Sequence, residues 1–127
     1  MTTQTAVWTE NIEFHASSAI TFGNSETDSI DIAGAGYIKI KAQIWITFGT
    51  GTDGGVTVNI YSDSNSGASP DTIPLTSLEI PNTDSETKKV SISIELEPFV
   101  DIEVINNDGS ESVTYVGKYS GMKGDSA

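Results

Sequence analysis

Acidic side chains gather in one stretch of the chain, at Glu95, Glu97, Asp101 and Glu103. Paired carboxylates held roughly 5 to 10 Å apart in a cleft can cleave glycosidic bonds, one as the acid and the other as the nucleophile or base. Here the carboxylates alternate with apolar residues, which places them on the side of a strand opposite to the apolar side. We therefore expect solvated surface groups and not an acid–base pair.

The chain has a single histidine, His15, and many serines. A serine hydrolase pairs its histidine with a nucleophile and a carboxylate, and α/β-hydrolases carry the serine in a G-x-S-x-G turn. That turn does not occur in this sequence, and no serine or cysteine is recognisable as a partner of His15. The sequence predicts a surface or packing histidine and a protein that is not an enzyme.

A possible cation site lies where Asp63 and Asn65 are followed by Gly67, and Asp71 could close the ring of oxygen ligands. Calcium uses oxygen ligands at such spacing, but Pro74 stands at the twelfth position, where a glutamate completes the calcium loop. Asp, Asn, Ser and Gly are also the ordinary residues of turns. We predict a turn without a metal, keep calcium at Asp63, Asn65 and Asp71 as the lesser alternative, and expect no cofactor.

Four aromatic residues are the candidate binding residues: Trp8, Tyr37, Trp45 and Tyr61. Tyr37 and Trp45 fall on the polar side of a predicted strand, and Tyr61 has the matching outward phase on the next one. An aromatic ring on a wet face can stack on a sugar or pack against another protein. The segment around Trp8 could also cover these rings. We favour packing within or between subunits over ligand stacking.

The elements that position these candidates are strands. Residues 37–48 alternate between two sets, and a period of two places successive side chains on opposite faces of a strand. The apolar set consists of Ile38, Ile40, Ala42, Ile44, Ile46 and Phe48. Further extended segments are expected at residues 5–9, 11–16, 28–33, 56–62, 73–80, 88–96, 100–105 and 112–119.

Turn residues separate these segments. Gly49–Gly55 and Asn106–Gly109 predict hairpin loops, because glycine and Asn-Gly or Asp-Gly pairs adopt the backbone conformations of tight turns. Pro74 and Pro81 bracket one segment and predict an edge strand, since proline cannot donate a hydrogen bond to a neighbour.

Strands at this even spacing, with polar opposite faces, predict an all-β fold. We expect an antiparallel β-sandwich of about eight strands, jelly-roll-like. The length of 127 residues fits a single domain over residues 1–127, with an extended N-terminal segment 1–16 and a flexible tail 121–127.

The charge balance is lopsided, with 18 acidic residues against 6 lysines, no arginine and a net charge of −12. DNA, RNA and anionic membranes attract Lys and Arg, so we expect neither a nucleic-acid nor a membrane partner. The lack of cysteine excludes disulfides and thiolate zinc sites. No apolar stretch reaches the roughly 20 residues of a membrane span, and the first residues lack the basic and apolar parts of a secretory signal.

Residues 46–63 resemble a recurrent pattern in small virion proteins of tailed bacteriophages. In that pattern a long strand ends in a Thr-Phe-Gly step, here Thr47–Gly49, a glycine loop follows, and the next strand ends in a Tyr-Ser pair, here Tyr61 and Ser62. The resemblance extends over about residues 30–106. It implies a β-sandwich structural module on a head or tail, without catalytic residues.

Taken together, these features predict a bacteriophage virion structural protein, foremost a capsid decoration or auxiliary protein. Its partner would be the major capsid protein or another virion protein, bound by protein–protein contacts. Two alternatives stay open: a tail-associated virion protein, and a carbohydrate-binding module that stacks sugars on Tyr37, Trp45 and Tyr61. We also expect a homo-oligomer, with a trimer favoured, that is made in the host cytoplasm and located in the virion.

Overall fold

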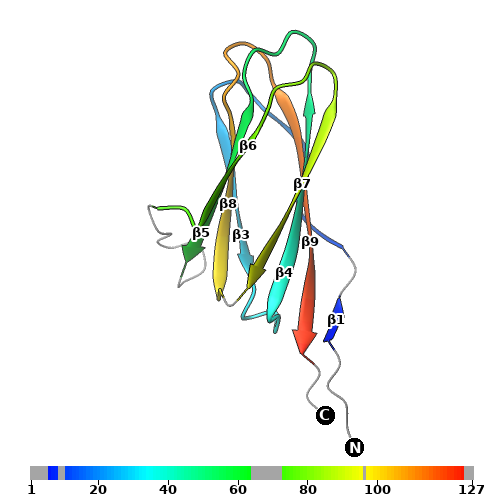
Figure 1. Ribbon diagram of the computed structural model, residues 1–127, viewed down its shortest axis with the longest axis vertical. Helices are drawn as coiled ribbons and strands as arrows, with labels where there is room; N and C mark the ends of the chain where they lie inside the picture. The colour runs from blue at the N-terminus through cyan, green and yellow to red at the C-terminus, as the bar shows by residue number, and fades with distance from the viewer. Residues whose placement is uncertain (1–5, 9–10, 64–72, 96, 125–127) are drawn as a thin grey trace, which may run out of the picture.

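The computed structural model describes residues 6–8, 11–63, 73–95 and 97–124, and within them it contains nine strands and no helix (Figure 1). The strands are β1 (Ala6–Trp8), β2 (Ile12–Ile20), β3 (Ser25–Asp31), β4 (Lys39–Phe48), β5 (Val56–Asp63), β6 (Thr76–Ile80), β7 (Thr87–Glu95), β8 (Phe99–Asn106) and β9 (Val113–Gly124).

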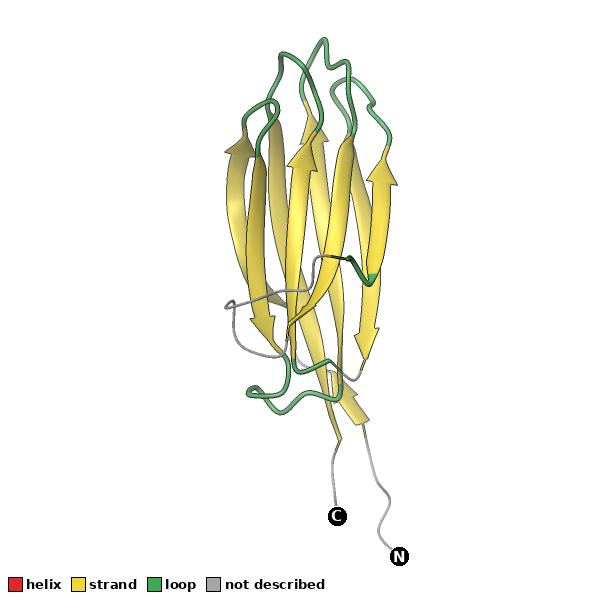
Figure 2. Ribbon diagram, turned by 90° about the vertical axis from the view of Figure 1, so that its left-hand side faces the viewer, coloured by secondary structure: helices red, strands yellow, loops and turns green. Residues whose placement is uncertain are grey.

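Two antiparallel sheets lie face to face (Figures 1 and 2). Sheet A has the order β1-β9-β4-β7, and β2 also pairs with β9; sheet B has the order β3-β8-β5-β6. β1 and β2 follow one another along the same side of β9, so each sheet has four strand positions. The predicted β-sandwich of about eight strands is confirmed.

The chain changes sheet at every connection from β2 to β9, except between β5 and β6. This is the jelly-roll arrangement. It corrects two predictions, because Gly49–Gly55 and Asn106–Gly109 are not hairpin loops. The first connects β4 of sheet A to β5 of sheet B, and the second connects β8 of sheet B to β9 of sheet A. The predicted edge strand is confirmed, since β6 is the last strand of sheet B.

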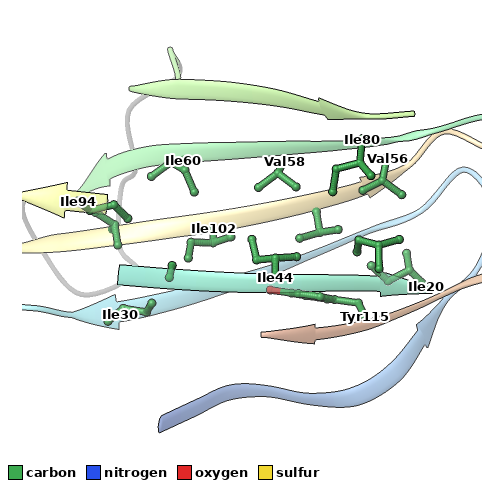
Figure 3. Close-up of a cluster of buried hydrophobic side chains, with 14 of the residues drawn as sticks. Ile20, Ile30, Ile44, Val56, Val58, Ile60, Ile80, Ile94, Ile102 and Tyr115 are labelled. Atoms are coloured by element: carbon green, nitrogen blue, oxygen red, sulfur yellow. The ribbon is translucent and has the colours of Figure 1, made fainter. Parts of the chain in front are cut away.

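Aliphatic side chains from both sheets fill the space between them (Figure 3). On β4 the alternation holds from Ile40 to Phe48. The inward-pointing residues are at most 2% exposed: Ile40, Ala42, Ile44, Ile46 and Phe48. It fails at Ile38, which is 50% exposed. The reason is a turn before β4, where the Tyr37 N–H donates to the Ile32 carbonyl at 3.0 Å. β4 therefore begins at Lys39 and not at residue 37.

Two buried glycines of β9 make room for aromatic rings. A Cβ on Gly117 would lie 2.4 Å from Phe14 Cζ, and one on Gly121 would lie 2.3 Å from Tyr37 Cε1. Both glycines pair with core residues of β4, so the two rings lie on the inner side of sheet A. Phe14 reaches this position because the pairing of β2 with β9 shifts between Glu13 and His15, as at a β-bulge.

At the end of the sandwich where β4 and β8 end, the side chain of Asp108 joins two of the connections between the sheets. Its Oδ2 accepts hydrogen bonds from the N–H groups of Asp53 (2.6 Å) and Gly54 (3.1 Å), and its Oδ1 accepts from those of Ser110 and Glu111. Burial alone would raise the pKa of this carboxyl, but the four N–H donors outweigh it and lower the pKa well below the ordinary range.

Asn106 closes the same end of the sandwich. Its side-chain amide is fully buried and donates to the carbonyls of Ile20 (2.9 Å) and Glu111 (3.0 Å), while its Oδ1 accepts from the Asp108 N–H. The residues that predicted a hairpin thus tie three segments of the chain together.

At the opposite end of the sandwich, β1 pairs with the end of β9, with Ala6 opposite Gly124. β9 therefore includes residues 121–124, which the sequence analysis assigned to a flexible tail. The extended N-terminal segment forms β1 and the start of β2 along one edge of sheet A.

Candidate functional site

The outer side of sheet A gathers basic and aromatic side chains. Because Ile40, Ile44 and Ile46 point into the core, the alternate residues of β4 point outward, and so do their partners on β7, β9 and β1. We call this surface the Lys–Trp face. It consists of Trp8, Lys39, Lys41, Trp45, Lys89 and Lys118.

Trp45 lies on β4, between β7 and β9, and is half-buried. Lys89 on one neighbouring strand places its Nζ 5.3 Å from the centre of the Trp45 ring, and Lys118 on the other places its Nζ 5.7 Å from it. Each ammonium is close enough for a cation–π interaction, which contributes about 0.5–1 kcal/mol at an exposed site. Two cations therefore hold the indole in position.

Trp8 extends the face along the edge of the sheet. It is 41% exposed, and Lys39 Nζ lies 5.6 Å from the centre of its ring. Lys39 also forms an ion pair with Glu95 at 3.5 Å. Trp8 and Trp45 are thus on one surface, the outer side of sheet A.

Tyr37 does not belong to this surface, and its predicted outward position is wrong. The ring lies over Gly121 and packs edge-on against Tyr119, with the ring centres 6.1 Å apart. Lys123 Nζ lies 5.6 Å from the centre of the Tyr37 ring. Because β4 starts only at Lys39, the alternation that would have turned Tyr37 outward does not reach it.

Tyr61 points outward, but from the other sheet. It lies on β5, next to Asp101 and across from the Lys–Trp face on the far side of the sandwich. Its hydroxyl donates to Glu103 Oε1 at 3.1 Å. Burial, followed by the hydrogen bond and the negative charge of Glu103, raises the pKa of Tyr61. A stacking platform of Tyr37, Trp45 and Tyr61 is therefore not formed.

The sequence predicted that the carboxylates of residues 95–103 are all solvated surface groups, and this prediction is wrong for Asp101. Asp101 lies on the central strand β8, is only 2% exposed and accepts a hydrogen bond from Ser29. Glu103 is half-buried and also accepts from Asn59, while Glu97 accepts from Ser62. Glu95 lies on the other sheet and is exposed.

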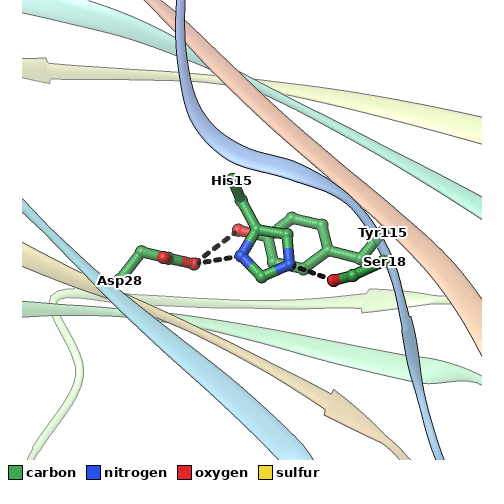
Figure 4. A network of polar contacts seen from close by, with 4 residues as sticks. All are labelled: His15, Ser18, Asp28 and Tyr115. Atoms are coloured by element: carbon green, nitrogen blue, oxygen red, sulfur yellow. Dashed lines mark hydrogen bonds and ion pairs between the residues drawn. The ribbon is translucent and has the colours of Figure 1, made fainter.

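His15 has partners that the sequence did not reveal (Figure 4). Its Nδ1 lies 2.9 Å from Asp28 Oδ2, and its Nε2 lies 2.8 Å from Ser18 Oγ. The imidazole stacks on Tyr115, with the ring centres 4.0 Å apart. The expectation that His15 has no serine partner is thus wrong. It failed because the bulge in β2 turns His15 inward, toward a carboxylate on the adjacent edge strand of the other sheet.

Asp28, His15 and Ser18 have the connectivity of a hydrolase triad, but they also close the edge between β2 and β3. Two shallow depressions flank them. One is lined by residues 19–21 and 23–26, and the lining of the other includes Phe14 and Asp31. Burial, followed by the charge of Asp28 and its hydrogen bond, raises the pKa of the Tyr115 hydroxyl.

The predicted cation loop is only partly described. Asn65 and Asp71 lie outside the described residues, as does the side chain of Asp63. Among the residues that the structure does describe, no three His, Asp or Glu side chains are grouped so that they could hold a metal. None of the described segments forms a helix that is long and apolar enough to cross a membrane.

Comparison with known proteins supports the fold. No protein-family model matches the sequence, and no curated protein matches it. A solved structure described in the words "Bacillus endospore appendages form a novel family of disulfide-linked pili" is similar, with a TM-score of 0.52 and 14% sequence identity. The alignment covers 96% of this chain and 92% of that one. This chain has no cysteine, so a disulfide linkage cannot be carried over.

Proposed function

We propose that this protein is a non-enzymatic structural protein of a bacteriophage virion, foremost a capsid decoration or auxiliary protein. The observation that carries the proposal is the Lys–Trp face, where both tryptophans of the chain lie on one flat sheet. Tryptophan is enriched at protein–protein interfaces, where it provides a large contact area with little loss of side-chain entropy. Jelly rolls are also a recurrent architecture of capsid domains.

Trp8 is the proposed anchor to the particle. It is the more exposed of the two tryptophans and lies on a short edge strand at the end of the sandwich where the described chain begins and ends. A ring in that position can enter a pocket of the major capsid protein or another virion protein without disturbing the sandwich. Lys39, beside Trp8, would favour an acidic rim around such a pocket.

A carbohydrate-binding module is the weaker candidate. Sugar rings stack on the open face of an aromatic ring, but Lys89 and Lys118 lie against the ring of Trp45. Tyr37 packs toward the core and Tyr61 lies on the opposite sheet, so neither ring joins Trp45 in the predicted stacking platform. A glycan array that shows binding lost in Trp45→Ala would favour this candidate over the virion protein.

The proposed function is tested by mass spectrometry of intact purified particles and by rebinding. We expect this chain in particles at a copy number comparable to that of the shell protein. We also expect Trp8→Ala to weaken rebinding of purified protein to depleted particles by about 30-fold or more, as for an interface hot spot. Ile73→Ala is the matched control, because Ile73 is an exposed apolar residue, 78% accessible, at the edge of the other sheet. Absence of the chain from particles would contradict the proposal.

A further inference from the structure

The two sheets differ sharply in charge. All six lysines lie in strands of sheet A, which contain only two acidic residues, Glu13 and Glu95. The strands of sheet B contain no lysine. They contain seven acidic residues: Glu26, Asp28, Asp31, Asp63, Glu79, Asp101 and Glu103. A chain with a net charge of −12 thus has one sheet with a positive excess.

The acidic groups on the outer side of sheet B form a second flat surface. We call it the acid face and define it as Asp31, Glu79 and Glu103, which alternate with inward-pointing core residues. Hydrogen bonds hold its carboxylates in place: Thr57 donates to Glu79 at 2.9 Å, and Asn59 and Tyr61 donate to Glu103. These contacts reduce the side-chain entropy that the carboxylates would lose on binding.

We infer that the Lys–Trp face of one copy binds the acid face of a second copy. The inference goes beyond the proposed attachment to a particle: the anchor of that attachment is Trp8 at the end of the sandwich, whereas this contact uses the part of the Lys–Trp face around Trp45. Lys41, Lys89 and Lys118 would meet Glu79, Glu103 and Asp31 of the neighbour, and Trp45, which lies against Lys89 and Lys118, would provide apolar contact. The two surfaces are opposite in charge, and each is the outer side of an antiparallel sheet.

The net charge does not prevent this contact. Two copies at −12 repel each other at long range, but the Debye length is about 8 Å at physiological ionic strength. Salt therefore screens the repulsion between charges on distant loops, whereas the interactions between charges in contact across the interface are screened much less. In this contact the lysines of one copy lie opposite the carboxylates of the acid face of the other, so the local interaction is attractive.

The geometry predicts an open stack rather than a closed ring. The Lys–Trp face and the acid face lie on opposite sides of the sandwich, so each bound copy presents a free face for the next. Such a heterologous contact repeats along a line unless a rotation closes it. Since packed sheets are about 10 Å apart, a stack of sandwiches would repeat at about 20 Å.

A pair of capping variants tests the inference. Lys89→Glu with Lys118→Glu reverses two charges of the Lys–Trp face and leaves the acid face unchanged. Thr27→Lys with Glu79→Lys places two positive charges on the outer side of sheet B, one beside Glu103 and one at the exposed Glu79 position, and leaves the Lys–Trp face unchanged. We expect sedimentation to show wild-type species at multiples of 13.4 kDa that grow with concentration. Each double variant alone should be monomeric, and an equimolar mixture of the two should form a 1:1 dimer and nothing larger.

Lys88→Glu with Lys123→Glu is the matched control, because it changes the net charge by the same amount as Lys89→Glu with Lys118→Glu, at two lysines outside the Lys–Trp face. Lys88 pairs with Glu86, and Lys123 lies against Tyr37. This variant should assemble like the wild type, with its fold checked by circular dichroism. Monomeric wild type at millimolar concentration, or a mixture that fails to dimerise, would overturn the inference. Loss of particle binding alone would contradict only the proposed function.

Discussion

The ring of Phe14 occupies the space that a side chain at Gly117 would need, since a Cβ there would lie 2.4 Å from Phe14 Cζ. The two residues lie on adjacent strands of sheet A, and the β-bulge in β2 brings the ring over the glycine. The pair shows how the sandwich fits a large ring beside a central strand.

Gly117→Ala should therefore destabilise the protein by about 1–3 kcal/mol, the usual cost of overpacking a well-filled core. Urea unfolding followed by tryptophan fluorescence would measure the change. Gly49→Ala is the matched control, because its Cβ would meet only the Ser112 carbonyl oxygen at 3.8 Å, an ordinary contact. Equal effects of the two substitutions would contradict the packing argument.

Acid should weaken the contact between the two connections that Asp108 joins. The pKa of Asp108 is lower in the folded protein than its ordinary value near 3.8, so its stabilising effect is complete above that value. The effect is lost progressively as the pH falls below it, toward the folded-state pKa. Asp108→Asn should lower the urea midpoint at pH 7 and flatten the decrease in stability between pH 5 and pH 2.

The comparison variant for Asp108 is Glu95→Gln, which changes the same charge at an exposed carboxylate on the outer side of sheet A. Its pH profile should run parallel to that of the wild type. If Asp108→Asn also runs parallel, the four backbone donors do not stabilise the charged carboxylate as argued.

The contact between His15 and Asp28 should contribute to stability at neutral pH. It joins β2 of sheet A to β3 of sheet B at an edge where Tyr115 lies beneath the imidazole. His15→Ala removes both the hydrogen bond and the ring stacking, so we expect a loss of about 2–4 kcal/mol in the free energy of unfolding. Tyr115→Phe should cost less, about 1 kcal/mol, because its hydroxyl is 3.5 Å from Asp28.

Ser18 tests the proposal that the protein is not an enzyme. A working triad would hydrolyse p-nitrophenyl esters and react with a fluorophosphonate probe through Ser18. We expect the wild type and Ser18→Ala to give the same background rate and no labelling, because the cluster closes an edge of the sandwich. Turnover above background that is lost in both Ser18→Ala and His15→Ala would contradict the non-enzymatic proposal.

Local alternation of residues was enough to predict most of the strands. The side chains of residues 40–48 alternate between core and solvent as predicted, because one side of β4 packs into the core and the other side faces water. The same reasoning located the strands on either side of Gly49–Gly55. It did not show that they belong to different sheets, since alternation carries no information about which strand pairs with which.

The candidate site depended on that missing information. Trp8 and Trp45 share a surface because β1 and β4 both pair with β9, whereas Tyr61 follows the chain into sheet B. Asp101 is buried because β8 is a central strand, and His15 meets Asp28 through a bulge and a contact between sheets. Each of these outcomes comes from long-range pairing that no short segment of sequence encodes.

The distribution of lysines makes the molecule an electric dipole whose axis runs across the sandwich, from the carboxylates of one layer to the ammonium groups of the other. Such a molecule turns in the field of a charged object before it touches it, despite an unfavourable total charge. Near a negatively charged protein shell, each copy would approach with β4 and β9 facing inward and β5 and β8 facing the solvent. The charge distribution would thus orient each copy before its contacts with the shell form.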